Sequence, residues 1–363
     1  MISFDRLNAY LIETGELLRD RIPKIPFVQQ LGAGPIKERL LDYVMRGGKN
    51  LRPALTRMAC GAVGGDPDHT LSVGMAIEMT HTWTLVHDDI IDRDDSRRGG
   101  LSVHAQIRQD YAQWELTNPG MTVDHLAHSM AILVGDAQHA MAMEILSDSA
   151  LRGPLLPELA LYLISELEGK VLPALLTGEV DDVFLTGCSL ESITPDDIMV
   201  MLRRKTAALL TFSVVAGGMI GLMRPDPYHP SIQALRTYGD ALGVAFQLRD
   251  DILGIQGDEG KLGKPVGSDF KEGKRTLAMK MAWDHANASQ RLLIDSLLGK
   301  KDMSAEDIAS LRSLIETLGA VEAVNEQAET LVQSARNALD ALPDTPARDL
   351  LSDVAEYAVI RQK

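Results

Sequence analysis

The chain has 363 residues, of which 45% are hydrophobic and 4% aromatic, and 36 Lys and Arg against 51 Asp and Glu give a formal net charge of −15. This charge argues against a nucleic-acid partner, because such partners are bound mainly by Lys and Arg that neutralise phosphates. The two cysteines, Cys60 and Cys188, lack CxxC spacing, so we expect no disulfide framework and no cysteine-type zinc site, and we expect a cytoplasmic protein.

Helical periodicity dominates the chain and predicts an all-α protein. Residues 36–46 carry an apolar stripe with the 3.6-residue period of a helix. Further helices are predicted, in chain order, at 71–92, 125–147, 158–177, 195–220, 236–256 and within 303–363. The starts at Thr194 and Ser304 have the residue pattern of helix caps. Period-two alternation is scarce, and no uncharged apolar run reaches the ~18 residues of a membrane helix, so we expect neither a sheet nor a transmembrane segment.

The predicted helices favour a single-domain helical bundle. We expect a helical extension at residues 1–34 and one domain at 35–363. The irregular stretches, each with Gly or Pro, are 93–121, 222–231 and 257–275. The first and last of these are rich in charge and directly follow acidic helix ends, so the chemistry is expected there.

The segment DDIIDRDDSRRGG, residues 88–100, places three aspartates at helical spacing. Asp88 and Asp92 lie one turn apart on the same face, and Asp89 is rotated by about 100° from Asp88. Carboxylates on one face repel each other unless a cation lies between them, and Mg²⁺ prefers such hard oxygen ligands together with phosphates and water. For this segment taken alone, a solvated helix end is an equally good interpretation.

A second acidic pair, Asp250 and Asp251 in FQLRDDILGIQGD, lies on another apolar helix. The neighbouring Leu248 and Ile252 indicate that this helix is buried on most sides, and charged pairs in such surroundings are rarely tolerated without partners or a metal. Two acidic pairs, each followed by a basic loop with glycines, therefore favour a shared metal-binding cavity over two solvated helix ends.

Clusters of Lys and Arg indicate an anionic ligand. Arg can bind phosphate oxygens in pairs, Lys supplies a point charge, and glycines let backbone N–H groups approach an anion. The basic residues near the two acidic motifs and in the chain's other basic stretches are Arg46, Lys49, Arg52, Arg97, Arg98, Lys205, Lys261, Lys264, Lys271, Lys274 and Arg275. We interpret the anion as a diphosphate that Mg²⁺ bridges to the aspartates, with room for two such ligands. The segments GAGPIK and GDEGKLGKP do not fit the nucleotide-binding loops.

Five motifs, in order and spacing, resemble the trans-polyprenyl diphosphate synthases, the head-to-tail prenyltransferases that include farnesyl and geranylgeranyl diphosphate synthases. They are GGKNLRP, EMTHTWTLVHDDIIDRDDSRRG, LRRKTAAL, FQLRDDILG and GKPVGSDFKEGKRT, and the match covers roughly residues 35–275. The resemblance implies an all-α isoprenoid-synthase fold with a central cavity faced by the two aspartate-rich helices. It also implies a homodimer.

The resemblance also implies residue roles. Two or three Mg²⁺ ions, with Mn²⁺ as a possible substitute, are expected to bind mainly at Asp88, Asp92 and Asp250, with Asp89 and Asp251 in support. The diphosphate of isopentenyl diphosphate is expected at Lys49, Arg52, His81 and Arg98. The allylic diphosphate and its developing charge are expected at Arg97, Lys205, Thr206, Gln247, Lys264 and Lys274, and the first four of these are the expected catalytic residues.

The implied mechanism ionises the allylic diphosphate with metal assistance, after which the double bond of isopentenyl diphosphate attacks the carbocation and a proton is lost. A chain that grows from Asp88 back along the 71–92 helix passes about one isoprene unit per ~5.4 Å turn. Trp83 and Thr84 lie about one turn away and are expected to form the floor of that cavity. In this family an aromatic residue five positions before the first Asp limits product length, so we expect geranylgeranyl diphosphate (C20) first and farnesyl diphosphate (C15) second.

Three departures from the family pattern stand out. Gly254 replaces a frequent third Asp, Glu179 stands where Gln is common, and Asn50 replaces a frequent Arg.

Two alternative functions share the chemistry or the fold. A class I terpene cyclase would be expected to lack the GGKxxR loop and the DDILG motif, and a non-catalytic partner subunit would be expected to lose aspartates from the first motif. Both signatures are intact here.

Overall fold

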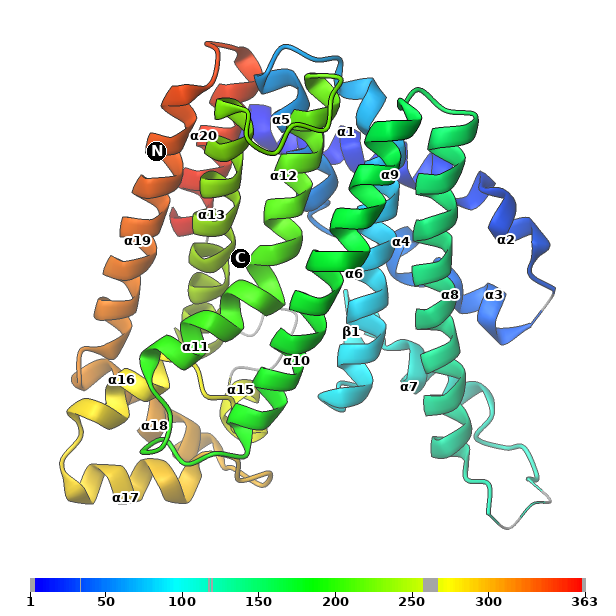
Figure 1. Ribbon diagram of the computed structural model, residues 1–363. Helices are drawn as coiled ribbons and strands as arrows, with labels where there is room; N and C mark the ends of the chain where they lie inside the picture. The colour runs from blue at the N-terminus through cyan, green and yellow to red at the C-terminus, as the bar shows by residue number, and fades with distance from the viewer. Residues whose placement is uncertain (1–3, 33, 117, 119, 257–266, 361–363) are drawn as a thin grey trace. The chain divides into compact units, whose positions relative to one another are not determined.

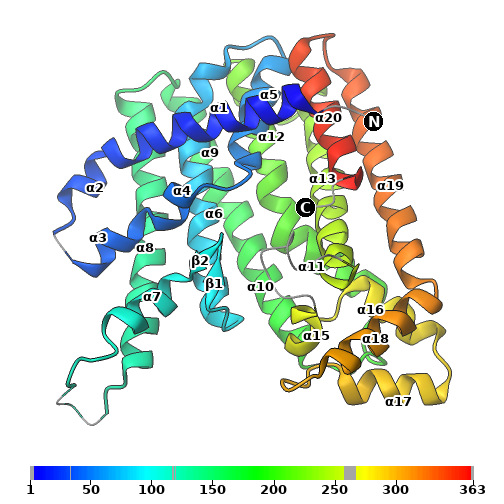
Figure 2. The same cartoon turned by 180° about the vertical axis from the view of Figure 1, so that it is seen from behind.

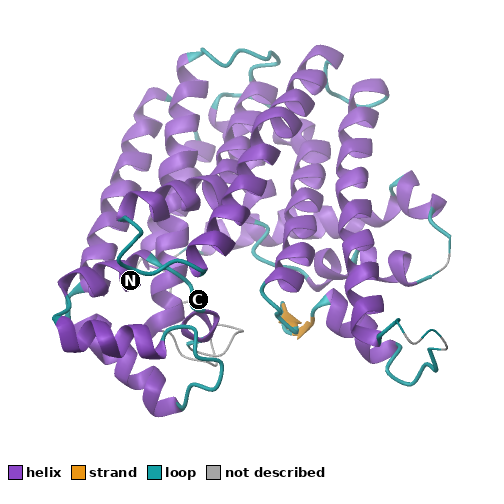
Figure 3. Ribbon diagram, turned by 60° about the horizontal axis from the view of Figure 1, so that its bottom comes forward, coloured by secondary structure: helices purple, strands orange, loops and turns teal. Residues whose placement is uncertain are grey.

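The computed structural model describes residues 4–32, 34–116, 118, 120–256 and 267–360. These residues form helices almost throughout, with one small antiparallel strand pair, as Figures 1 and 3 show. The all-α prediction is confirmed. Across the described part of the chain, no helix combines the length and apolar character needed to cross a bilayer. The chain divides into two compact units, residues 1–164 with 216–226 and residues 165–215 with 227–363.

The first unit is built around the long helices α6 and α8, which pack against each other. Its elements are α1 (Asp5–Arg21), η1 (Ile22–Lys24), α2 (Pro26–Gln30), α3 (Pro35–Leu40), α4 (Asp42–Arg46), α5 (Leu51–Ala62), η2 (Pro67–Thr70), α6 (Leu71–Ile91), β1 (Ser96–Arg97), β2 (Gly100–Leu101), α7 (Val103–Asp110), α8 (Val123–Leu151) and most of α9 (Pro157–Glu166). Helix α1 contacts α5, as Figure 2 shows, and Arg57 of α5 pairs with Glu13 of α1 at 3.1 Å. The predicted extension at 1–34 therefore packs onto the helices that follow it.

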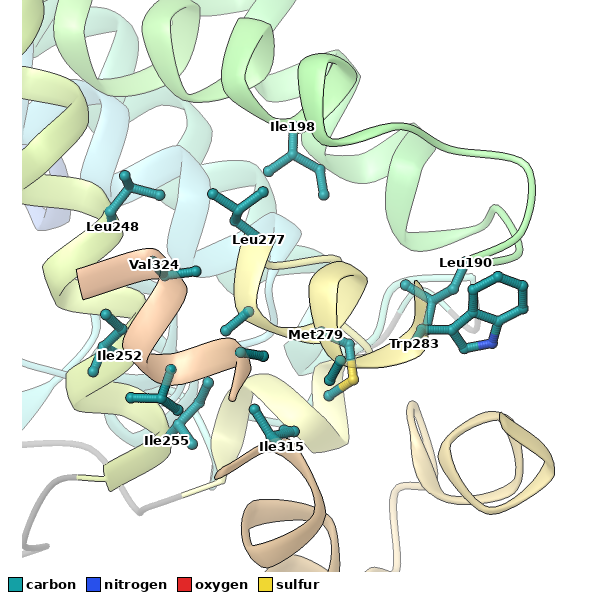
Figure 4. Close-up of a cluster of buried hydrophobic side chains, with 14 of the residues drawn as sticks. Leu190, Ile198, Leu248, Ile252, Ile255, Leu277, Met279, Trp283, Ile315 and Val324 are labelled. Atoms are coloured by element: carbon teal, nitrogen blue, oxygen red, sulfur yellow. The ribbon is translucent and has the colours of Figure 1, made fainter. Parts of the chain in front are cut away.

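The second unit has its core between α13, α16 and α19. Its elements are η3 (Leu167–Val171), α10 (Leu172–Thr186), α11 (Pro195–Leu202), η4 (Arg203–Ala207), the first half of α12 (Ala208–Gly221), α13 (Pro230–Gln256), α15 (Ser268–Glu272), α16 (Leu277–His285), α17 (Ala288–Leu297), α18 (Ala305–Thr317), α19 (Ala320–Ala338), η5 (Leu339–Ala341) and α20 (Pro346–Ile360). Ile198, Leu248, Leu277 and Val324 belong to one buried cluster that joins these helices (Figure 4).

Both caps predicted from the sequence are confirmed. The side chains of Thr194 and Ser304 accept hydrogen bonds from the backbone N–H groups of Asp197 and Asp307. The carboxylates of these aspartates in turn accept hydrogen bonds from the backbone N–H groups of Thr194 and Ser304, which makes two capping boxes. The sequence missed α5, because Pro53 interrupts its apolar pattern. Proline is tolerated there since the N–H groups of a helix's first turn have no partner within the helix.

Two helices that were predicted as continuous are each interrupted by one π-helical turn. The 158–177 segment contains η3 and the 195–220 segment contains η4. Such turns insert one extra residue and often occur at functional sites. The η4 turn contains Lys205 and Thr206, two residues that the sequence assigned to substrate binding.

Candidate active site

The first acidic motif lies where α6 ends. Asp88 and Asp92 are half-buried one turn apart, and the N–H of Asp92 donates to the carbonyl of Asp88 at 2.7 Å. Asp89 is 0% exposed and faces the protein interior. The helix therefore presents the first and last aspartates of the motif differently from the middle one, as the 100° rotation per residue requires.

Both oxygens of Asp89 are engaged within the first unit. Oδ1 accepts hydrogen bonds from Nε of Arg97 at 2.8 Å and from its Nη2, and Oδ2 accepts one from the hydroxyl of Tyr43. Burial raises the pKa of Asp89, and the hydrogen bonds from Arg97 oppose that rise. Burial likewise raises the pKa of Tyr43, and the neighbouring Asp89 charge adds to it, so the phenol stays protonated as a donor.

The second arginine of the motif, Arg98, has the left-handed φ of 50° and turns back toward α4 and α6. Its Nη1 donates to the carbonyl of Tyr43 at 2.5 Å, and its Nη2 lies 3.3 Å from Oε1 of Glu78. Gly48 makes room for this guanidinium, because a Cβ there would lie 3.0 Å from its Cζ. Arg98 thus lies beside the GGK loop, as the predicted isopentenyl diphosphate set requires.

Glu78 is the buried counter-charge of this basic group. It is 3% exposed, and burial raises its pKa while Arg98 and Arg52 lower it. One turn further along α6, desolvation and the charges of Arg52, Arg98 and Arg97 lower the pKa of His81 well below its usual value. His81 is therefore a neutral imidazole at pH 7, and it can offer one N–H donor to an anion.

The loop before α5 adopts left-handed backbone at Gly47 (φ 78°) and at Asn50 (φ 48°). Among non-glycine residues Asn tolerates this conformation best, which accounts for Asn50 where the family has a frequent Arg. Its side-chain amide donates to the carbonyl of Gly48 at 2.9 Å. Lys49 is exposed between them, and Arg52 is half-buried in the first turn of α5.

Trp83 and Thr84, the predicted floor, lie on α6 before the acidic motif. Trp83 is 8% exposed, and its ring contacts His87 edge-on at 5.7 Å and His139 of α8 at 5.0 Å. The hydroxyl of Thr84 donates to the carbonyl of His81 at 2.9 Å. Gly135 of α8 leaves the space that the His87 ring fills.

In the second unit, three residues that the sequence singled out form one hydrogen-bonded chain. The hydroxyl of Thr206 donates to Oε1 of Gln247 at 3.0 Å, and Nε2 of Gln247 donates to Oδ1 of Asp251 at 2.9 Å. Burial, together with the neighbouring charges of Asp269 and Asp250, raises the pKa of Asp251 to about 8. A cation placed beside this carboxyl group would favour its ionised form.

Lys205 is held by two carboxylates of α10. Its Nζ lies 2.7 Å from Oε2 of Glu179 and 2.6 Å from Oδ2 of Asp182. Gly178 allows this approach, because a Cβ at that position would meet the backbone of Arg204 and Lys205. The unusual Glu179 thus acts as a second counter-ion for the lysine.

Gly254, where a third aspartate is common, has a carboxylate beside it from another element. Oδ2 of Asp269, on α15, would lie 2.7 Å from a Cβ at Gly254. Lys274 pairs with Glu272 at 3.0 Å and contributes a favourable charge to Asp251. Lys264 lies outside the described residues.

The oxygen ligands of the acidic motif fit a magnesium ion whose remaining coordination positions are filled by a phosphate-bearing substrate. Among the residues that the structure describes, no group of three or more His, Cys, Asp or Glu side chains could hold a metal by itself. Mg²⁺ commonly takes one or two carboxylates and fills its remaining positions with phosphate oxygens and water. Half-buried pairs such as Asp88 with Asp92 are suited to that mode.

Sequence reasoning missed four polar residues of these two groups: Tyr43, Glu78, Asp182 and Asp269. Each had a local signal. Glu78 is one helical turn before His81, Asp182 is one turn after Gly178, and Asp269 lies inside the GKPVGSDFKEGK loop. Tyr43 precedes the GGK loop by one turn, but only the structure shows that its hydroxyl reaches Asp89.

Comparison with known proteins points to one family. A family model described as Polyprenyl synthetase matches residues 35–315. The short chain isoprenyl diphosphate synthase of Methanothermobacter thermautotrophicus is 33% identical over 99% of this chain and 98% of its own. The geranylgeranyl diphosphate synthase of Saccharolobus solfataricus is 31% identical over the full length of both chains. A crystal structure of geranylgeranyl pyrophosphate synthase from Corynebacterium glutamicum, complexed with isoprenyl diphosphate and magnesium, matches with a TM-score of 0.85 and 29% identity over 97% of this chain and 99% of that one.

Proposed function

Because the chain belongs to the polyprenyl synthetase family and is a head-to-tail prenyltransferase, we propose that its main product is geranylgeranyl diphosphate, with farnesyl diphosphate second. The observation that carries the product length is Trp83, a nearly buried indole one turn before Asp88. Two of the similar proteins are geranylgeranyl diphosphate synthases, which supports the same length. Neither a terpene cyclase nor a non-catalytic subunit is favoured, since relatives over nearly the whole chain are prenyl diphosphate synthases.

The first unit is proposed to bind isopentenyl diphosphate through Lys49, Arg52, His81 and Arg98. Arg98 contacts the buried Glu78 at 3.3 Å, and the charges of Arg98 and Arg52 both lower the pKa of Glu78, so this carboxyl group balances the positive charge of the pair before the anion arrives. Arg binds phosphate oxygens in pairs, and the neutral His81 adds a directional donor. The diphosphate of isopentenyl diphosphate is not the leaving group, so a site of basic side chains and a neutral donor, without metal-binding aspartates, suits it.

The allylic diphosphate is proposed to bind with Mg²⁺ at Asp88 and Asp92 and at Asp250, with Arg97, Lys205, Lys264 and Lys274 supplying further positive charge. Mg²⁺ would stabilise the negative charge that develops as the allylic C–O bond breaks. Lys205, held by Glu179 and Asp182, can donate to the leaving oxygens, and the oxygen atoms of Thr206 and Gln247 can face the carbocation. The crystal structure with isoprenyl diphosphate and magnesium supports divalent metal use, and two or three ions are proposed here.

A cytoplasmic homodimer is proposed as the working form. Both cysteines are free, as in proteins of reducing compartments. Helix α8 exposes Ile132 at 44% and Leu133 at 51%, adjacent apolar side chains that a second copy of the chain would cover. Light scattering should give twice the mass of the chain, and Leu133→Glu should shift it toward the monomer.

The direct test supplies isopentenyl diphosphate and Mg²⁺ with a C5, C10 or C15 allylic diphosphate and measures the length of the products. We expect elongation that stops mainly at C20. Asp88→Asn should abolish most of the turnover, whereas Asp148→Asn, at a half-buried carboxylate of α8 that pairs with Arg152, should leave it unchanged. Failure to elongate any primer would contradict the proposal, and products beyond C20 would contradict the assigned length.

A further inference from the structure

Tyr43, Asp89 and Arg97 form one hydrogen-bonded chain inside the first unit. Tyr43 and Asp89 are both 0% exposed. The Tyr43 hydroxyl accepts the N–H of Val103 at 3.0 Å and donates to Oδ2 of Asp89, while Arg97 binds Oδ1. The Tyr43 hydroxyl and both carboxyl oxygens of Asp89 are thus hydrogen-bonded, as buried polar groups require.

This arrangement separates Asp89 from the two aspartates beside it. Asp88 and Asp92 are half-buried, whereas Asp89 has both oxygens engaged and no exposed surface. To reach a metal ion, Asp89 would have to give up the hydrogen bonds from Tyr43 and Arg97, which would leave the buried Tyr43 hydroxyl without an acceptor and Arg97 with only the longer contact to Asp94 at 3.4 Å. Breaking a buried charge pair in this way is strongly unfavourable.

The same turn of α4 also holds the loop that carries Arg97. Arg46 donates to the carbonyl of Arg97 at 3.0 Å and to that of Leu101 at 2.8 Å, and the carbonyl of Tyr43 accepts from Arg98. Arg97 is 19% exposed, and its Nη1 has no hydrogen-bond partner among the residues that the structure describes. One edge of this guanidinium is thus fixed on Asp89, and one nitrogen remains for a phosphate oxygen.

We propose that Tyr43 is a positioning residue for the prenyl transfer reaction. It fixes Asp89, Asp89 fixes Arg97, and Arg97 presents its remaining nitrogen to the allylic diphosphate. Asp89 is then an anchor for Arg97 and not a metal ligand, which revises the role that the motif alone indicates. The inference rests on the proposed role of Arg97 in binding that substrate.

The test compares Tyr43→Phe, Asp89→Asn and the double variant with the wild type. For each, kcat, the KM of both substrates and the Mg²⁺ concentration for half-maximal rate are measured. Tyr43→Phe should lower kcat/KM for the allylic substrate about 10-fold and leave the Mg²⁺ requirement and the KM of isopentenyl diphosphate within about 2-fold. Asp89→Asn should lower it at least as much, and the double variant should be no worse than Asp89→Asn, because the tyrosine acts through the aspartate.

Two controls make the outcome specific. Tyr238→Phe removes another fully buried hydroxyl, which donates to the carbonyl of Leu351 at 2.7 Å in the second unit, and should leave all four measured quantities near wild type. Asp88→Asn should raise the Mg²⁺ requirement about 10-fold or more.

An Asp89→Asn variant with the same raised Mg²⁺ requirement would overturn the anchor role. Equal kinetics in Tyr43→Phe and Tyr238→Phe, or multiplicative losses in the double variant, would overturn the positioning role of Tyr43. A wild type that elongates no primer would instead contradict the proposed function itself.

Discussion

Gly178 should be required for activity because it lets α10 approach the π-helical turn that carries Lys205. In Gly178→Ala, the new Cβ would lie 2.8 Å from the carbonyl carbon of Arg204 and from Cα of Lys205, and closer still to the Lys205 amide nitrogen. Ordinary carbon contacts are about 3.5–4.0 Å. These atoms belong to the backbone and cannot rotate away, so either α10 or the η4 turn has to shift by about 1 Å.

The expected loss is larger in rate than in stability. Overpacking of this kind costs about 1–3 kcal/mol, and the better helix propensity of Ala returns about 1 kcal/mol of it. A displacement of about 1 Å at a positioned catalytic group can cost about 100-fold in rate. Lys205 and its partners Glu179 and Asp182 lie on the two elements that are forced apart. We therefore expect kcat to fall by about 10- to 100-fold. The melting temperature should fall by only a few degrees.

The matched control is Gly169→Ala. Gly169 lies in the other π-helical turn, η3, and a Cβ there would meet no atom within 4 Å. This variant should keep wild-type kcat and gain up to about 1 kcal/mol of stability. Steady-state kinetics with the preferred primer and thermal unfolding of both variants decide the matter. If Gly178→Ala keeps wild-type kcat, or if both variants lose activity equally, the close approach does not position Lys205.

Three further substitutions test the floor and the second acidic motif. Trp83→Ala should lengthen the products by about one isoprene unit per helical turn that is opened, ~5.4 Å, and an unchanged product distribution would refute the floor. Asp251→Asn should stabilise the metal-free protein, measured by thermal unfolding in EDTA. Because the folded state raises the pKa of this acid from 3.8 to about 8, the cost of its ionisation grows from pH 4 to pH 8 and reaches ~6 kcal/mol above that range. The gain should therefore increase with pH across this window, and a gain independent of pH would contradict the cause. Gly254→Asp should lower activity although many family members have Asp there, because its Cβ would lie 2.7 Å from Oδ2 of Asp269 and its charge would repel that carboxylate. Gly254→Ala adds no charge and should lower activity less. A Gly254→Asp variant more active than the wild type would refute this explanation.

Much of the fold follows from local sequence. The apolar period predicted α6, α8 and α13 to within a few residues at most ends, and the caps at Thr194 and Ser304 follow from side-chain chemistry that acts within one turn. The π-helical turns were not predicted, because the extra residue of such a turn rotates the apolar stripe by about 100°, and a helix that is apolar on most faces shows no clear break at that point. The η4 turn is accompanied by a close approach between Gly178 and the backbone of Lys205, two residues far apart in the sequence.

The site was predictable as a set of residue types but not as a set of contacts. Charge, spacing and resemblance selected Thr206, Gln247 and Asp251 separately, and the structure joins them by hydrogen bonds. The counter-ions were harder to find. Glu78 is a single acid in an apolar helix and Asp182 is one of three acids in GEVDD, and their importance comes from cations that reach them from other elements.

The two acidic motifs share a geometric property that the sequence DD does not show. Neighbouring residues on a helix differ in direction by about 100°, so both members of an adjacent pair cannot face the same ligand equally well. In the first motif Asp89 turns inward and accepts hydrogen bonds from Tyr43 and Arg97. In the second, Asp251 accepts one from the amide of Gln247. In each pair a carboxyl oxygen of the second aspartate therefore accepts a hydrogen bond from a side chain of its own unit of the protein. A DD motif read from sequence alone therefore does not show which of its two carboxylates already accepts hydrogen bonds inside the protein, and the contacts of the second aspartate do.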